Sequence, residues 1–250
     1  MVEAFIDAPQ CRKGLTVFPL IASHGPVLPY LLSTEIHGSG TLTIKERREG
    51  GTPMLLARNN SLHALLIFAG EPLPGGSPGR LVERSVLLAG KHVTQIPPSS
   101  TEQGGWLNPG QEAEITDWLR SFPIQNRQVG LLGFHGDRAL GLEALGSTNL
   151  YARLHRRLLI RFMKDAMAGP AQACGDAIAL EEEAQKLVSA IVDSDRVATK
   201  RVGLGTHRLL TGPVSGAELT YEGHLVHLSA RPAPAWESAR SPEEGSRQCS

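Results

Sequence analysis

Short apolar runs, each about the length of one β-strand, fill the first half of the chain and limit what it can fold into. Clusters of Gly, Pro and Asn separate these runs, which cover 15–20, 41–44, 54–57, 64–69 and 86–88. None is long enough for an amphipathic helix of about ten residues. Because the runs recur at intervals of roughly ten residues without helical segments between them, we expect antiparallel pairing.

The spacing of the apolar residues changes in the second half. Leu150, Leu154, Leu158 and Phe162 recur every four residues, which predicts a long helix capped by Ser147 or Thr148. The other elements that the pattern predicts are a helix over 111–121, a hairpin of 129–134 and 139–144 around a turn at 135–137, a helix over 180–193, and further strands within 201–229.

These elements predict an α+β fold, with a mainly antiparallel β-sheet system and two or three packed helices. We expect one domain over residues 13–230 and a disordered C-terminal tail over 231–250, where few large apolar residues occur. Two subdomains split near residues 106–128 are the alternative.

Composition narrows the classes of function. The 250 residues carry 25 Lys and Arg against 25 Asp and Glu, which gives no overall attraction to nucleic acid. No apolar run is long enough to span a bilayer, and no secretory signal is recognisable at the start of the chain. The cysteines, 11, 174 and 249, are odd in number and scattered, so we expect neither a disulfide framework nor a zinc site, and we predict a reducing, cytoplasmic location.

Two short motifs resemble catalytic or cofactor sites and fail on physical grounds. Ser77 stands in a G-x-S-x-G pattern, but Pro78 lacks the backbone N–H that an oxyanion hole would need. Residues 203–208 lack the third glycine of a dinucleotide-binding loop. His224 and His227 would point to opposite faces of one strand, where we interpret them as structural. We therefore predict no cofactor and no metal.

Two acids and one basic helix remain as candidates. Glu71 and Glu102 both lie where an apolar run gives way to a glycine-containing loop, a placement typical of a pocket rim. If they converged, one could act as an acid and the other as a base, whereas a turn-capping role is the alternative for each. The basic residues of the long helix mostly avoid its apolar stripe, which favours a solvated face over an anion-binding patch.

Three segments, 66–73 (LIFAGEPL), 80–88 (RLVERSVLL) and 96–106 (IPPSSTEQGGW), resemble the ARG and Rhodanese-Phosphatase-superfamily-associated protein family. Weaker matches follow in the same order up to residues 202–205 with Arg208 and 226–228, so that the resemblance covers roughly residues 13–230. The chain departs from the family pattern at Pro72, Gly79, Ser100 and Gly105, and the serine at 100 argues against thiol chemistry.

The family is uncharacterised, and its name records an association with ADP-ribosylglycohydrolase-type proteins. The resemblance therefore implies binding or processing of an ADP-ribosyl or NAD-derived nucleotide, with a small nucleotide-like ligand as partner. The acids Glu102 and Glu71 are then the catalytic candidates, and the ligand-binding candidates are Arg80, Gln103, Trp106 and Arg208. A non-catalytic interaction protein that uses its sheet or its basic helix is the alternative. The sequence predicts no membrane or nucleic-acid partner and gives no oligomeric state.

Overall fold

The computed structural model describes residues 4–23, 30–36, 38–49, 52–72, 81–96, 111–199 and 201–234. Of the predicted site residues, Arg80, Glu102, Gln103 and Trp106 lie outside these ranges, as does most of the predicted tail. The prediction of a single domain over 13–230 stays a prediction. Within the described residues, no helix combines the length and the apolar character needed to cross a membrane.

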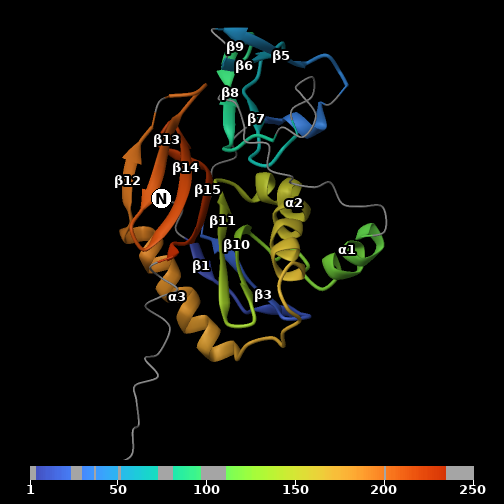
Figure 1. Ribbon diagram of the computed structural model, residues 1–250, viewed down its shortest axis with the longest axis vertical. Coiled ribbons are helices and arrows are strands. Elements are labelled where there is room, and N and C mark those ends of the chain that lie inside the picture. The colour runs from blue at the N-terminus through green and yellow to red at the C-terminus, as the bar shows by residue number, and fades with distance from the viewer. Residues whose placement is uncertain are drawn as a thin grey trace, which may run out of the picture.

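A nine-stranded antiparallel sheet forms the body of the molecule (Figure 1). Its order is β1-β3-β10-β11-β15-β14-β13-β12, and β2 also pairs with β3. The strands are β1 (Ala4–Ile6), β2 (Gln10–Arg12), β3 (Leu15–Ala22), β10 (Gln128–His135), β11 (Arg138–Leu145), β12 (Asp195–Ala198), β13 (Thr206–Thr211), β14 (Val214–Tyr221) and β15 (His224–Pro232).

Two three-stranded sheets form a smaller lobe above the main sheet in Figure 1. One is β5 (Leu42–Glu49), β6 (Thr52–Asn59) and β9 (His92–Ile96), and the other is β4 (Leu31–Leu32), β7 (Leu65–Ile67) and β8 (Val86–Leu88), next to a short 3-10 helix over Ser33–Glu35. The pair β4 and β7 is parallel. The buried side chains of Leu32, Leu66, Phe68 and Leu87 join one hydrophobic cluster with those of the main sheet, so the lobe packs directly on it.

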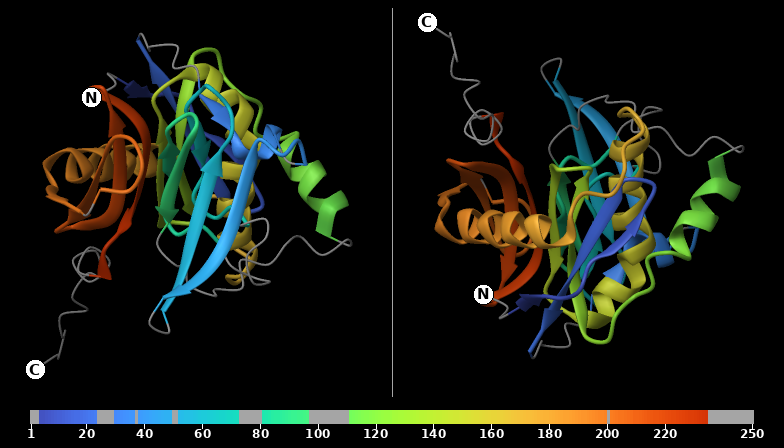
Figure 2. Two further views of the ribbon diagram at one scale, coloured as in Figure 1. Left: turned by 90° about the horizontal axis from the view of Figure 1, so that it is seen from above. Right: turned by 90° about the horizontal axis from the view of Figure 1, so that it is seen from below.

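Three helices accompany the sheets in the described part of the chain: α1 (Gln111–Leu119), α2 (Thr148–Met167) and α3 (Ala177–Asp193). Successive side chains of a strand point to opposite faces of its sheet. In β3, Leu15 and Val17 belong to the cluster that contains the apolar stripe of α2, whereas Phe18 and Leu20 belong to the cluster that contains α3. The main sheet therefore carries α2 on one face and α3 on the other, and Figure 2 shows α3 (orange) crossing the C-terminal strands (red).

The structure confirms the α+β fold with mainly antiparallel sheets. Ser147, rather than Thr148, caps α2 by accepting a hydrogen bond from the N–H of Leu150. Helix α3 begins three residues earlier than expected because the carboxylate of Asp176 caps it, accepting from the N–H groups of Ile178 and Ala179. The strands β1, β2, β9 and β12 were not expected; each has exposed residues and lies at an edge or beside one, where sequence patterns are weakest.

The expectation of no disulfide is wrong. Cys11 of β2 is bonded to Cys174, which lies in the segment between α2 and α3, with 6.4 Å between their Cα atoms. The two cysteines are 163 residues apart in sequence, so their spacing could not indicate that they meet. The argument from scattered cysteines to a reducing compartment loses its basis, and the cytoplasmic location stays a prediction.

Candidate functional site

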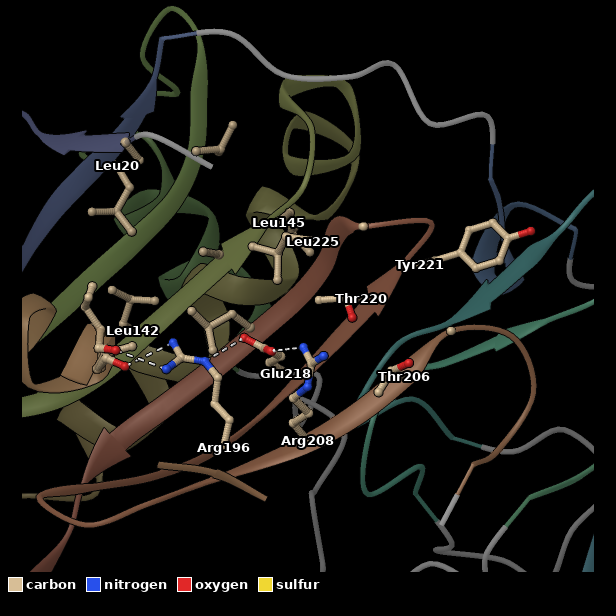
Figure 3. A pocket seen from close by; sticks show the side chains of 18 of the residues that line it. Leu20, Leu142, Leu145, Arg196, Thr206, Arg208, Glu218, Thr220, Tyr221 and Leu225 are labelled. Atoms are coloured by element: carbon tan, nitrogen blue, oxygen red, sulfur yellow. Dashed lines mark hydrogen bonds and ion pairs between the residues drawn. The ribbon is translucent and has the colours of Figure 1, made fainter. Parts of the chain in front are cut away.

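A cavity with a volume of about 690 Å³ lies on the α3 side of the main sheet. Its floor is apolar and comes from strands β3, β10, β11 and β15 and from helix α3: Leu20, Val129, Leu142, Ala144, Val188, Ile191 and Leu228. Its rim is polar and comes from the loop before β13 and from β12, β13 and β14: Arg196, Arg201, Thr206, Arg208, Thr220 and Tyr221. Figure 3 labels Leu20 and Leu142 of the floor together with Arg196, Thr206, Arg208, Thr220 and Tyr221 of the rim.

Arg208 reaches this cavity because of the register of two neighbouring strands. Arg208 of β13 lies opposite Glu218 of β14, and its Nη1 atom donates to Oε1 of Glu218 over 2.9 Å. Among the described residues, Glu218 is the one hydrogen-bond partner of the Arg208 guanidinium. The Arg208 side chain is 39% exposed. The remaining N–H groups of Arg208 are thus available to a ligand at the rim.

Arg196 lines the same cavity, but four of its five N–H groups already have partners. Its Nη1 donates to the carbonyl oxygens of Val192 and Ser194 over 3.0 Å, and its Nη2 donates to that of Ile191 over 3.2 Å. These carbonyls belong to the last turn of α3, where a helix leaves such groups without partners. Arg196 therefore caps α3, and its Nε also reaches Glu218 over 3.3 Å (Figure 3).

The predicted catalytic acid Glu71 lies elsewhere. Its side chain is buried in the small lobe, with Nη1 of Arg157 2.6 Å from Oε1 and the Ser33 hydroxyl donating to Oε2. Burial raises the pKa of the Glu71 carboxyl above its usual value and outweighs Arg157 and Ser33, which act in the opposite direction. Glu71 does not line the cavity that contains Arg208. Glu71 and Arg208 are the two site candidates that lie within the described residues, and the structure does not bring them together.

The basic face of α2 is partly exposed, as expected, but three of its arginines also form ion pairs. Arg153, Arg157 and Arg161 follow one another at four-residue spacing and so lie on one side of the helix. They pair with Glu35, Glu71 and Glu143, which come from three different parts of the fold. The sequence could not indicate these partners, because the carboxylates lie 118, 86 and 18 residues from their arginines, beyond the three- and four-residue spacing of pairs within a helix.

Sequence reasoning also missed Arg201, Thr206, Thr220 and Tyr221. Each stands in or beside a strand of the C-terminal region, where single polar residues have no distinctive motif. The only available signal was the glycine-containing segment 203–205, because Gly203 and Gly205 have positive φ values of 68° and 84° and allow the chain to turn into β13. Within the described residues no group of three His, Cys, Asp or Glu side chains could hold a metal ion.

The comparisons with known proteins agree with the resemblance seen in the sequence. No curated protein and no solved structure matches the chain. The family model of the ARG and Rhodanese-Phosphatase-superfamily-associated Protein domain matches residues 3–112 and 107–231. These two matches cover nearly all of the described strands and helices, and the chain therefore belongs to this family.

Proposed function

We propose that the chain binds a small ligand that joins an apolar or flat part to an anionic group, of the nucleotide or ADP-ribosyl class, in the cavity beside Arg208. The observation that carries this proposal is the combination of an apolar floor with the Arg208 guanidinium, which has one hydrogen-bond partner among the described residues. The choice of an ADP-ribosyl or NAD-derived ligand comes from the family resemblance. The cavity itself argues for the amphipathic character of the ligand.

The volume of the cavity suits a ligand of this size, because pockets for small molecules usually enclose about 300–1,000 Å³. In a nucleotide complex the base would lie on the leucine floor and remove apolar surface from water. Arg208, with Arg201 beside it on the rim, would bind a phosphate through charge-assisted hydrogen bonds. The hydroxyl groups of Thr206 and Thr220, which also line the cavity, would hydrogen-bond a ribose.

The alternative of a non-catalytic interaction protein has less support. The three arginines of α2 that would form a basic surface are engaged with carboxylates. The exposed large apolar side chains of the described residues lie on different elements and loops rather than in one patch: Phe5, Leu62, Val93, Ile124, Ile178, Val192 and Val197. Single exposed apolar residues are normal on a protein surface and do not indicate a docking site.

Ligand-induced stabilisation tests the proposal. ADP-ribose, NAD and AMP near millimolar concentration should raise the thermal midpoint of the protein, whereas ribose, which lacks a phosphate, should not. Arg208→Gln should abolish the shift, because it removes the charge and leaves Glu218 paired with Arg196. Arg58→Gln is the matched control, since Arg58 is exposed on β6, away from the cavity. No shift with any nucleotide, or an equal shift in Arg208→Gln, would refute the proposal.

A further inference from the structure

A second cavity, of about 450 Å³, lies where the main sheet meets the small lobe. Its lining includes Ser85 and Arg84 from the lobe, Arg161 from α2, and His207, His227 and Arg231 from the main sheet. Side chains 227, 229 and 231 of β15 alternate with Leu228 and Ala230, which face the α3 side. The second cavity therefore lies on the opposite face of the main sheet from the cavity beside Arg208.

A chain of hydrogen bonds crosses the wall of this cavity. The Ser85 hydroxyl lies 2.9 Å from Nδ1 of His227, and Nε2 of His227 lies 2.8 Å from Oε2 of Glu143. Glu143 comes from β11 and His227 from the neighbouring strand β15, so the main sheet fixes this part of the chain. The ring of Phe68 packs against the imidazole of His227, with 4.4 Å between the two ring centroids.

The partners of His227 determine its tautomer. An ionised carboxylate can only accept hydrogen bonds, so Nε2 of His227 must donate to Glu143, and Nδ1 is left with a lone pair. The Ser85 hydroxyl therefore donates its proton toward Nδ1. The chain thus joins three groups in order. Ser85 can act as a nucleophile, His227 as the base that takes its proton, and Glu143 as the carboxylate that orients the base. Serine proteases use the two ring nitrogens in the opposite sense, but proton transfer needs only one acceptor and one donor.

Glu143 is held in its ionised form. Its side chain is 3% exposed, and the cost of burying it is outweighed by His227, by Nη1 of Arg161 at 2.6 Å and by the Ser229 hydroxyl at 2.8 Å. These contacts lower the pKa of the Glu143 carboxyl below its usual value. A buried carboxylate in this state stabilises an imidazolium when His227 accepts a proton.

Two further groups indicate the chemistry of a ligand. Arg84 directly precedes Ser85, is partly buried and makes no hydrogen bond or ion pair with any described residue. His207 is 5% exposed, its Nε2 donates to the Ser85 carbonyl over 2.8 Å, and its Nδ1 is buried without a partner among the described residues. A guanidinium without a partner suits an anionic group, and a lone pair on a neutral imidazole suits a hydroxyl donor.

We propose that Ser85 is the nucleophile of an esterase site, with His227 as general base and Glu143 as its orienting carboxylate, acting on esters of small hydroxylated anionic compounds. Arg84 binds the anionic group of the substrate, and Nδ1 of His207 accepts a hydrogen bond from its hydroxyl. The cavity is lined by three arginines, Arg84, Arg161 and Arg231, and by two acids, Glu83 and Glu218, and this excess of positive charge favours the oxyanion that forms during the reaction. This activity is independent of nucleotide binding beside Arg208.

The reaction proceeds in two steps, acylation of Ser85 and hydrolysis of the acyl-serine. Oγ of Ser85 attacks the ester carbonyl carbon, and the serine proton passes to Nδ1 of His227. His227 then gives this proton to the departing alcohol oxygen as the C–O bond breaks, leaving an acyl-serine. A water molecule attacks the acyl carbon and gives a proton to His227, which returns it to Oγ of Ser85 as the carboxylic acid leaves.

The competing explanation is structural, because the same chain of bonds also joins the lobe to the sheet and the N–H of Ala69 donates to Oγ of Ser85 over 3.0 Å. Covalent labelling separates the two explanations. An alkyl fluorophosphonate at pH 7.5 should add one phosphonyl group to the native protein, and peptide mass spectrometry should locate it on Ser85. Absence of labelling, or labelling of another residue alone, would overturn the proposal.

Ser215→Ala is the matched control for Ser85→Ala, because both serines line this cavity and Ser215 takes no part in the chain of hydrogen bonds from Ser85 to Glu143. Ser85→Ala should abolish labelling, whereas Ser215→Ala should still be labelled. If Ser85→Ala fails to fold, Ser85→Cys restores a nucleophile of similar size and should react with an iodoacetamide probe faster than Ser85→Cys combined with His227→Gln. Equal rates in these two would equally contradict the proposal.

Hydrolysis of 4-nitrophenyl esters tests the substrate class. The native protein should prefer a succinate half-ester, which carries a carboxylate, to the acetate ester. Arg84→Gln should reduce this preference, measured as the ratio of kcat/KM values, by about tenfold, the effect of one charge contact of roughly 1.4 kcal/mol. Arg208→Gln should change neither labelling nor hydrolysis, so failure of the nucleotide proposal and failure of this one are distinguishable. A preference for the neutral ester would contradict the assignment of Arg84.

Discussion

Arg157 places Nη1 2.6 Å from Oε1 of Glu71, joining the long helix α2 to the small lobe through a carboxylate that is only 3% exposed. The Arg157 side chain is 32% exposed, so water reaches one member of the pair and not the other. Removing either partner therefore has unequal consequences. The loss of Arg157 leaves a buried charge, whereas the loss of the Glu71 charge leaves a partly hydrated guanidinium.

Arg157→Gln should lower the free energy of unfolding at pH 7 by about 2–3 kcal/mol, because it leaves Glu71 buried without a cationic partner, with the Ser33 hydroxyl and the Phe68 backbone as its remaining described partners. Glu71→Gln should change it by less than about 1 kcal/mol, because the amide keeps the shape and can still accept hydrogen bonds. Urea unfolding measures both. If Glu71→Gln proved the more damaging variant, or if it abolished ligand binding with the fold intact, the structural role of Glu71 would be wrong.

Because Glu143 is buried, the stability of the folded protein should depend on pH in the acidic range. The folded-state pKa of Glu143 is lowered, so its contribution is present above the ordinary Glu pKa of about 4.3 and is lost as the pH falls through the lower folded-state pKa. The thermal midpoint of the native protein should therefore fall below about pH 4.3, and that of Glu143→Gln should fall less. Glu181→Gln, on the exposed side of α3, is the control and should follow the native protein. Identical profiles for all three would contradict this linkage.

The sequence predicts much of the fold because the central elements carry strong local signals. The four-residue repeat of Leu150, Leu154 and Leu158 gives α2, and the apolar runs on either side of Gly136 give the hairpin of β10 and β11. The edge strands are short and partly exposed, as in Gln10–Arg12 and Asp195–Ala198, so their patterns are weak. The pairing of Cys11 with Cys174 depends on tertiary structure, which no spacing rule contains.

The sites are less predictable than the fold. The order of family segments indicated Arg208, and the structure places it at a cavity, but Ser85, Glu143 and His227 come from segments that are up to 142 residues apart. Glu143 lies within an apolar run, where a single carboxylate was not recognised as a buried charge. His227 was interpreted as structural because His224 is not its partner, whereas its actual partners come from β11 and from the residue before β8.

The bond between Cys11 and Cys174 should be measurable directly. In denaturant without reductant, the chain should show one reactive thiol, and after reduction it should show three, the number of its cysteines. Reduction, or Cys174→Ser, should lower the free energy of unfolding by about 3–5 kcal/mol, because the bond closes a long loop in the unfolded chain. Three reactive thiols in the unreduced protein, or an unchanged thermal midpoint on reduction, would show that the pair is not bonded.

The two arginines beside Glu218 should separate stability from binding. Arg196 donates to three carbonyl oxygens at the end of α3, so Arg196→Gln should lower the free energy of unfolding by about 1–2 kcal/mol. Arg208 contacts Glu218 alone among the described residues, so Arg208→Gln should cost less than about 1 kcal/mol while removing the response to nucleotide. Urea unfolding and the thermal shift with ADP-ribose should be measured on both variants. Arg196→Gln should show the larger loss of stability, and Arg208→Gln the larger loss of the thermal shift. A stable Arg196→Gln that loses nucleotide binding would reverse the two roles and would assign the anion contact to Arg196 in place of Arg208.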